Sequence, residues 1–105
     1  MRSEATAPLI AVVDDEESIR AAMDSRIRSA GYRSVLFESG TALLDYGPKH
    51  RIDCLILDIS MPGMNGLVVQ HRLARMKCSI PTIVTFGEYD GHLLKMALKQ
   101  GQLYS

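Results

Sequence analysis

The sequence predicts an α/β fold, an open doubly wound parallel sheet, because short apolar runs alternate with segments of helical periodicity along its 105 residues. The clearest runs are residues 9–13 and 52–57, and the second is apolar almost throughout. Such continuous apolarity is typical of a parallel strand that is covered on both faces. Both runs end in acids, Asp14 and Asp15 after the first and Asp58 after the second.

The first half of the chain predicts two strand and helix units. After the strand at 9–13, apolar residues recur at helical spacing from Glu16 to Ala30, and Gly31 can end that helix in the left-handed conformation. A second strand is expected over Ser34 to Phe37. Ser39 can then cap a helix that continues through Tyr46, before the Gly-Pro pair that follows.

The second half continues the alternation. After the strand at 52–57 we expect a helix near 65–76, a strand at 82–86, a helix at 91–100 and the beginning of a fifth strand at 103–105. Right-handed crossovers would make all of these strands parallel. If the strand order is 2-1-3-4-5, the first and third strands are neighbours, and their carboxyl ends flank the switch point where such sheets bind ligands.

In that order Asp14, Asp15 and Asp58 share one crevice. Three carboxylates a few ångströms apart repel one another, which raises at least one pKa unless a cation lies among them. The available ligands are oxygens, including a backbone carbonyl after Asp58, so a hard divalent ion such as Mg²⁺ is favoured. A carboxylate can attack phosphorus to form an acyl phosphate, and Asp58 is the candidate nucleophile.

Simpler explanations exist for each acid. Asp15 alone could cap the first helix, and Asp58 could belong to turn chemistry, because Pro, Gly and Asn follow it closely. The combination favours a site: two acid-tipped strands occur in one chain, and the second is followed by Met-Pro-Gly-Met-Asn-Gly.

These residues resemble a known family. The segment Val-Val-Asp-Asp-Glu at 12–16, followed by Leu-Asp-Ile-Ser-Met-Pro-Gly-Met-Asn-Gly at 57–66, is similar to the receiver domain of bacterial two-component response regulators, the CheY-like superfamily. The likeness runs from about Leu9 to the C-terminus. It implies the flavodoxin-like strand order 2-1-3-4-5 considered above.

The resemblance also implies roles for particular residues. Asp58 would accept a phosphoryl group from a sensor histidine kinase or a small phosphodonor. Asp15 would bind Mg²⁺ directly, Asp14 would help through water, Asp58 would itself contact the ion, and Ser60 would offer its backbone carbonyl.

The chain departs from the family at the end of the fourth strand, where receivers carry a Thr or Ser. A gapless alignment places Phe86 there, and Thr85, one position earlier, would face the other side of the sheet. A slip of one residue would make Thr85 the switch hydroxyl and restore its usual spacing to an aromatic residue, here Tyr104. The sequence leaves both registers open.

The chain also ends at Ser105, before the family's Lys-Pro pair and fifth helix. Apolar residues on more than one face of the helix at 91–100 would then be exposed, which indicates either truncation or a homodimer formed through this helix and the fifth strand. We therefore keep a second hypothesis, a degenerate or truncated receiver that acts as a phosphorylation-independent binding or dimerisation module.

Other classes are less favoured. Turnover by an enzyme is not expected, because phosphohydrolases of the haloacid dehalogenase type carry an Asp where this chain has Ser60. Twelve basic and twelve acidic residues leave no net charge, so direct nucleic-acid or membrane binding is not expected. We expect residues 1–8 to form a flexible leader and residues 9–105 to form a receiver domain that is incomplete at its C-terminus. We expect the protein to be cytoplasmic and to act with an output domain or an effector protein.

Overall fold

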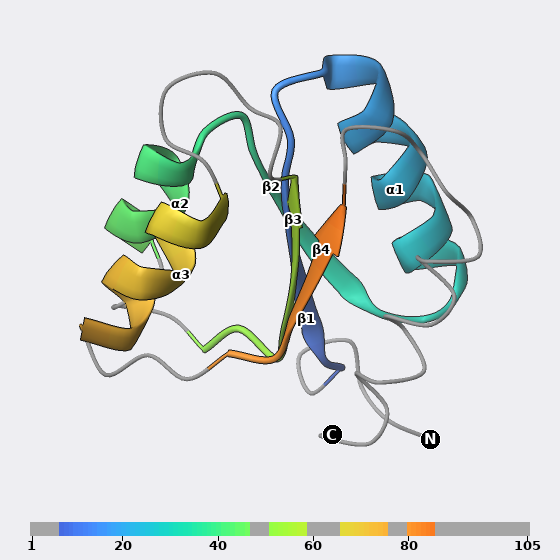
Figure 1. Cartoon of the computed structure of the whole chain (residues 1–105). Coiled ribbons are helices and arrows are strands. Elements are labelled where there is room, and N and C mark those ends of the chain that lie inside the picture. The colour runs from blue at the N-terminus through green and yellow to red at the C-terminus, as the bar shows by residue number, and fades with distance from the viewer. Residues whose placement is uncertain (1–6, 47–50, 59–65, 76–79, 86–105) are drawn as a thin grey trace.

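The computed structural model describes residues 7–46, 51–58, 66–75 and 80–85. Within these ranges strands and helices alternate, in the order β1 (Leu9–Val13), α1 (Glu17–Ser29), β2 (Arg33–Phe37), α2 (Gly40–Tyr46), β3 (Cys54–Asp58), α3 (Gly66–Arg75) and β4 (Thr82–Thr85). The strands form one parallel sheet in the order β2-β1-β3-β4 (Figure 1). The predicted fold class and this part of the predicted order are confirmed. The helix and fifth strand expected at 91–100 and 103–105 lie outside the described residues.

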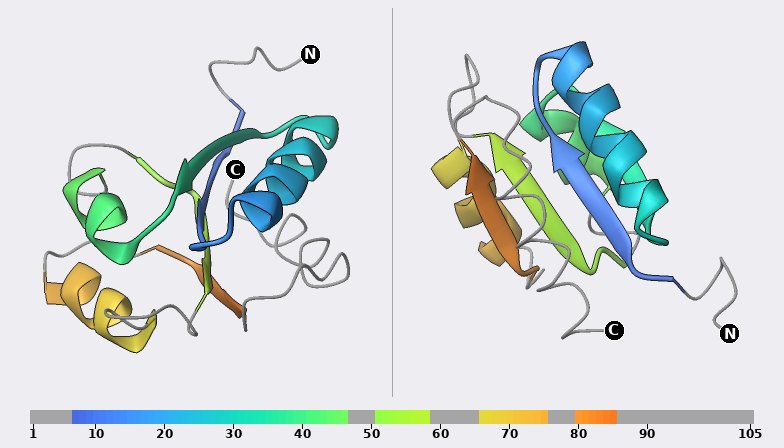
Figure 2. Two further views of the ribbon diagram at one scale, coloured as in Figure 1. Left: turned by 90° about the horizontal axis from the view of Figure 1, so that it is seen from above. Right: turned by 90° about the vertical axis from the view of Figure 1, so that its right-hand side faces the viewer.

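Helices cover both faces of the sheet, with α1 on one side and α2 and α3 on the other (Figure 2). The two-residue period of β1 divides its side chains between the faces: Ile10 and Val12 pack towards α1, and Leu9, Ala11 and Val13 towards α2 and α3. Every residue of β1 and β3 is buried, as the apolar sequences predicted.

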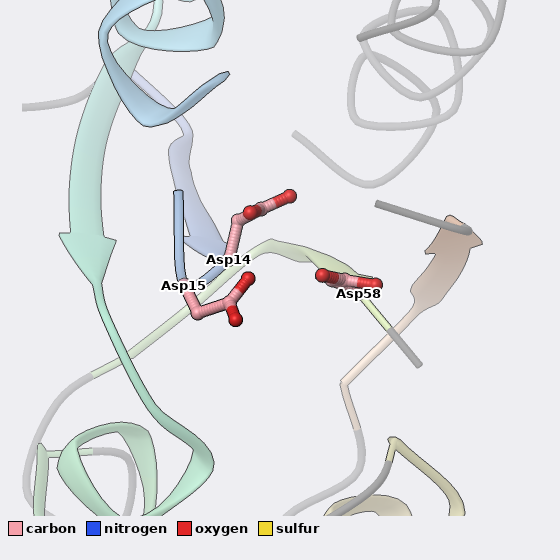
Figure 3. Close-up of side chains that lie close together, drawn as sticks. All are labelled: Asp14, Asp15 and Asp58. Carbon is pink, nitrogen blue, oxygen red and sulfur yellow. The ribbon is translucent and has the colours of Figure 1, made fainter. Parts of the chain in front are cut away.

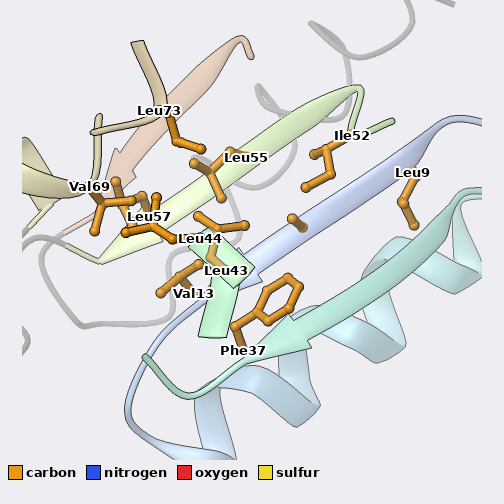
Figure 4. Packing of buried hydrophobic residues seen from close by; sticks show 11 residues of the cluster. Leu9, Val13, Phe37, Leu43, Leu44, Ile52, Leu55, Leu57, Val69 and Leu73 are labelled. Atoms are coloured by element: carbon orange, nitrogen blue, oxygen red, sulfur yellow. The ribbon is translucent and has the colours of Figure 1, made fainter. Parts of the chain in front are cut away.

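Each face has its own hydrophobic cluster. The α1-side cluster consists of Ile10, Val12, Ile19, Met23, Ile27, Cys54 and Ile56. The α2/α3-side cluster, shown in Figure 4, consists of Leu9, Ala11, Val13, Phe37, Leu43, Leu44, Ile52, Leu55, Leu57, Val69 and Leu73.

Local signals in the sequence determine where the helices begin and end. Gly31 follows α1 with a φ of 89°, so it takes the left-handed conformation that was predicted for it. Ser39 caps α2, because its Oγ accepts a hydrogen bond of 3.2 Å from the backbone N–H of Ala42. At the start of α1 the cap position is Glu16 and not Asp15, and no side chain makes the cap hydrogen bond.

The third strand begins later than expected, at Cys54 and not Ile52. Asp53 explains the difference. Its backbone N–H donates to the carbonyl oxygen of Leu9 at 2.9 Å, and its side-chain Oδ2 accepts from the Leu9 N–H at 2.8 Å. Where β1 and β3 first meet, the Leu9 N–H therefore has the Asp53 carboxylate as its acceptor in place of a backbone carbonyl.

Of the leader expected at 1–8, only Ala7 and Pro8 are among the described residues. Both of their carbonyl oxygens accept hydrogen bonds from Arg33, one from its Nε at 2.9 Å and one from its backbone N–H at 3.0 Å.

Candidate functional site

The parallel register brings the predicted site residues to one level of the sheet. Val13 and Leu57 are partners in the pairing of β1 with β3, so the acids that directly follow them, Asp14 and Asp58, come next to each other. Neighbouring strands lie roughly 4.8 Å apart, which sets the spacing of the two backbones. Figure 3 shows Asp14, Asp15 and Asp58 gathered at this edge.

The three carboxylates lie close enough together to share one ion. One oxygen from each of Asp14, Asp15 and Asp58 lies within 4.8 Å of the other two. Asp14 and Asp58 are each only 1% exposed, whereas Asp15 is open to solvent. Two of the three carboxylates are thus buried and one is exposed, and these three side chains together form the acidic pocket.

Asp14 is held firmly but remains partly unpaired. Its Oδ1 accepts a 2.9 Å hydrogen bond from the Glu16 N–H, while its buried Oδ2 has no hydrogen-bond partner among the described residues. Burial raises the pKa of Asp14, the hydrogen bond from Glu16 opposes that change, and the nearby carboxylates of Asp58 and Asp15 raise the pKa further. The predicted repulsion is therefore present at Asp14.

This arrangement suits a small, hard cation. The donors are all carboxylate oxygens, which Mg²⁺ prefers, and ligands on opposite sides of one Mg²⁺ are about 4.2 Å apart. A buried carboxylate oxygen without a partner is costly, and a bound cation would satisfy the Oδ2 of Asp14. The residues present therefore fit a divalent ion on their own chemistry.

Thr85 lies directly beside the acids. It is the register partner of Asp58 in the pairing of β3 with β4, and it is 3% exposed. Ile56 belongs to the α1-side cluster and Ile83 packs against that cluster, so Asp58 and Thr85, each two residues further along, continue the same face. Phe86, which occupies the hydroxyl position in the gapless alignment, lies outside the described residues, as does the predicted ligand Ser60.

Sequence reasoning missed one residue of this site, Arg20. Its Nη1 donates a 2.7 Å hydrogen bond to the backbone carbonyl oxygen of Asp14. A signal was available: Arg20 lies in the first turn of α1, where the helix dipole favours acidic and not basic side chains. A cation at that position needs a reason, and the Asp14 carbonyl supplies it.

A parallel sheet of this order, with carboxylates at the ends of its two central strands, is the arrangement that the resemblance to receiver domains implied. The chain belongs to the response regulator receiver domain family, because the sequence pattern of that family matches residues 10–103. The resemblance inferred from the acidic segments is thus confirmed.

Similar proteins of known sequence are response regulators. The chain is 39% identical over 95 residues to response regulator protein TmoT of Ectopseudomonas mendocina, covering 90% of this chain and 43% of that protein. It is 30% identical over 92 residues to transcriptional regulatory protein FixJ of Bradyrhizobium diazoefficiens, covering 88% of this chain and 45% of FixJ. The chain therefore spans less than half the length of these curated relatives.

Solved structures agree with the fold. The crystal structure of FixJ-N superposes with a TM-score of 0.72 at 30% identity, covering 96% of this chain and 78% of that one. Response regulator TrrA from Thermotoga maritima, solved in complex with Mg(2+)-BeF, gives a TM-score of 0.73 at 25% identity, covering 90% of this chain and 98% of TrrA. Among the described residues, no helix has the length and apolar character needed to span a membrane.

Proposed function

We propose that this chain is a phosphoryl-accepting signalling module in which Asp58 becomes an aspartyl phosphate in the presence of Mg²⁺. One observation carries the proposal: Asp58 is buried at the end of β3, shares a pocket with Asp14 and Asp15, and has Thr85 as its register partner. Membership of the receiver family supports the same conclusion.

The proposed chemistry uses each side chain differently. A carboxylate oxygen of Asp58 attacks the phosphorus, a new oxygen–phosphorus bond forms, and the bond to the donor's leaving group breaks. Asp15 and Asp14 would hold the ion, the first directly and the second through water, together with the backbone carbonyl of Ser60. When bound, Mg²⁺ supplies charge neutralisation for the phosphoryl oxygens.

Thr85 is proposed as the group that senses the phosphoryl oxygens. Its hydroxyl can donate a hydrogen bond, and its register places it on the Asp58 face of the sheet. A hydroxyl drawn towards a new phosphoryl group would change the end of β4 and thereby the affinity of the adjacent surface for a partner.

The proposed partners follow from the family. A sensor histidine kinase would supply the phosphoryl group in the cytoplasm, and an output domain or effector protein would respond to the modification. TmoT and FixJ are more than twice as long as the part of them that the chain matches, which supports a role for a second domain in proteins of this kind.

Phosphorylation can be measured directly by intact mass. The protein is incubated with acetyl phosphate and Mg²⁺, and we expect the wild type to gain the mass of one phosphoryl group. Asp58→Asn should gain none. Asp45→Asn, which alters an exposed carboxylate on α2, should behave as the wild type does.

Two outcomes would overturn the proposal: no adduct on the wild type under any donor, or an undiminished adduct on Asp58→Asn. Magnesium binding without phosphorylation by any donor would instead favour the degenerate binding module. Chelation of divalent ions supplies a further check, because the adduct should fail to form without them.

A further inference from the structure

The three acids of the pocket are supported in different ways. Asp58 is the last residue of a strand that is paired on both sides, with β1 and with β4. Asp14 and Asp15 lie beyond the last paired residue of β1, in the connection between β1 and α1. Contacts beyond the regular strand pairing therefore help to orient this short segment.

Hydrogen bonds around Asp14 supply that orientation. Its N–H donates to the Phe37 carbonyl oxygen at 3.1 Å, which continues the contact with β2. Its Oδ1 accepts from the Glu16 N–H at 2.9 Å. Its carbonyl oxygen accepts from Nη1 of Arg20 at 2.7 Å, the shortest of the three bonds and the one made by a charged side chain.

Arg20 is well placed to fix the peptide that joins the two acids. The carbonyl that it binds belongs to the Asp14–Asp15 peptide group, so turning that peptide would break the bond and redirect both carboxylates. Its own backbone N–H donates to the Glu16 carbonyl oxygen at 3.1 Å, which is the first regular backbone hydrogen bond of α1. The guanidinium therefore reaches back to the Asp14 carbonyl from a residue that the helix itself holds in place.

Arg20 acts through the backbone and not as the counterion of the pocket. Its hydrogen bond goes to the carbonyl oxygen of Asp14, while the buried Oδ2 of the Asp14 carboxylate has no hydrogen-bond partner among the described residues. Because Arg20 orients the carboxylates without neutralising their charge, the pocket keeps its affinity for a divalent cation.

We propose that Arg20 is a positioning residue for the divalent ion, which it never touches, because its hydrogen bond to the Asp14 carbonyl oxygen fixes the direction of the Asp14 and Asp15 carboxylates. The inference rests on the function proposed above. Outer residues that orient metal ligands typically change metal affinity by roughly 10- to 100-fold when they are removed.

The test replaces Arg20 by Met, which keeps the length of the aliphatic stem and removes every donor. The affinity for Mg²⁺ alone is measured by following backbone amide resonances during a titration with MgCl₂. We expect the dissociation constant of Arg20→Met to rise by about 10-fold or more, and Arg20→Lys, which retains a charged donor, to recover part of the loss.

A matched control is available on the same helix. Arg28 forms an exposed ion pair with Asp24 at 2.8 Å, away from the pocket, so Arg28→Met removes the same charge and a helix-stabilising contact. Its dissociation constant for Mg²⁺ should equal that of the wild type. The rate of phosphorylation by acetyl phosphate adds a second reading: at saturating Mg²⁺, Arg20→Met should approach the wild-type rate, because the defect lies in ion affinity.

The outcomes separate the two proposals. If the wild type binds Mg²⁺ and Arg20→Met binds it equally well, Arg20 has no positioning role and the proposed function stands. If the wild type neither binds Mg²⁺ nor takes a phosphoryl group, both proposals fall. If Arg20→Met does not fold, Arg20→Gln is measured in its place, because its shorter side chain does not reach as far as Nη1 of Arg20, and an affinity for Mg²⁺ equal to that of the wild type would refute the positioning role.

Discussion

Replacing Asp14 by Asn should stabilise the protein when no divalent ion is present. Two unit charges 4.8 Å apart, the largest separation of the pocket's ligand atoms, repel by about 0.9 kcal/mol in bulk water and about 3.5 kcal/mol at an effective dielectric constant near 20. Asp14 and Asp58 are both 1% exposed, so the true cost lies between these limits and not below them. The Asn carbonyl can still accept from the Glu16 N–H.

We therefore expect Asp14→Asn to raise the free energy of unfolding by about 1 to 3 kcal/mol in a chelator, or the melting temperature by several degrees. The measurement is urea unfolding with a chelator and again with excess Mg²⁺. Added Mg²⁺ should stabilise the wild type more than the variant, because the ion binds the folded wild type more tightly. A variant that is no more stable than the wild type in the chelator would refute the reasoning.

The pH dependence carries a sign that can be checked. Because the pKa of Asp14 is raised in the fold, its contribution favours folding below the ordinary value of 3.8 and is lost as the pH rises above it. The advantage of Asp14→Asn in the chelator should thus grow as the pH rises above 3.8. A constant advantage over this range would contradict the assignment.

Asp24 offers a control of opposite sign. Hydrogen bonds from Ser34 and Arg28 lower the pKa of Asp24, so its contribution is present above 3.8 and is lost as the pH falls below that value. Asp24→Asn should consequently destabilise the protein at neutral pH, by roughly 1 kcal/mol for this partly exposed group.

Three further changes test other parts of the fold. Leu55→Ala removes a fully buried side chain from the α2/α3-side cluster, so it should lower the free energy of unfolding, measured by urea titration, by about 2 to 5 kcal/mol. A loss under about 1 kcal/mol would mean that this face of the sheet is loosely packed. Gly31→Ala places a side chain at a φ of 89° with no atom within 4 Å of the new Cβ, so its cost of about 1 to 2 kcal/mol should come from the backbone alone, and Gly31→Asn should cost less. Burial raises the pKa of the Cys54 thiol to about 11. In a Cys78→Ser background, alkylation of Cys54 at pH 8 should therefore be much slower in the folded protein than in the urea-unfolded protein. Equal rates would show that β3 opens readily.

The sequence predicted the sheet well because its strongest signal is repeated. Apolar strands and helical periods alternate along the described residues, and the chirality of parallel crossovers leaves few alternative topologies. The approach of Asp14 to Asp58 followed from that topology, since acids at the ends of neighbouring parallel strands must meet. Strand boundaries were less predictable. The third strand begins at Cys54, because the Leu9 N–H donates to the side chain of Asp53 and not to a backbone carbonyl.

Two features of the site were not predictable from sequence for different reasons. The position of Thr85 beside Asp58 depended on the register of β3 with β4, and a period of two assigns opposite faces to neighbouring residues when the register is unknown. Phe86 lies outside the described residues, so Thr85 as the switch hydroxyl stays a prediction. Arg20 binds a backbone carbonyl six residues earlier, and although a basic residue in the first turn of α1 is a signal, it does not identify the bonding partner. The register and the reach of the guanidinium are both properties of the folded chain.

The stability of the unliganded pocket and its affinity for a cation are linked through the same interaction. The carboxylate repulsion that Asp14→Asn would relieve is also the repulsion that a divalent ion would neutralise, so the variant should gain stability and lose affinity together. Arg20 differs, because it orients Asp14 without reducing the charge of the pocket. Its loss should lower affinity without the gain in stability, and this contrast separates a residue that positions ligands from one that supplies them.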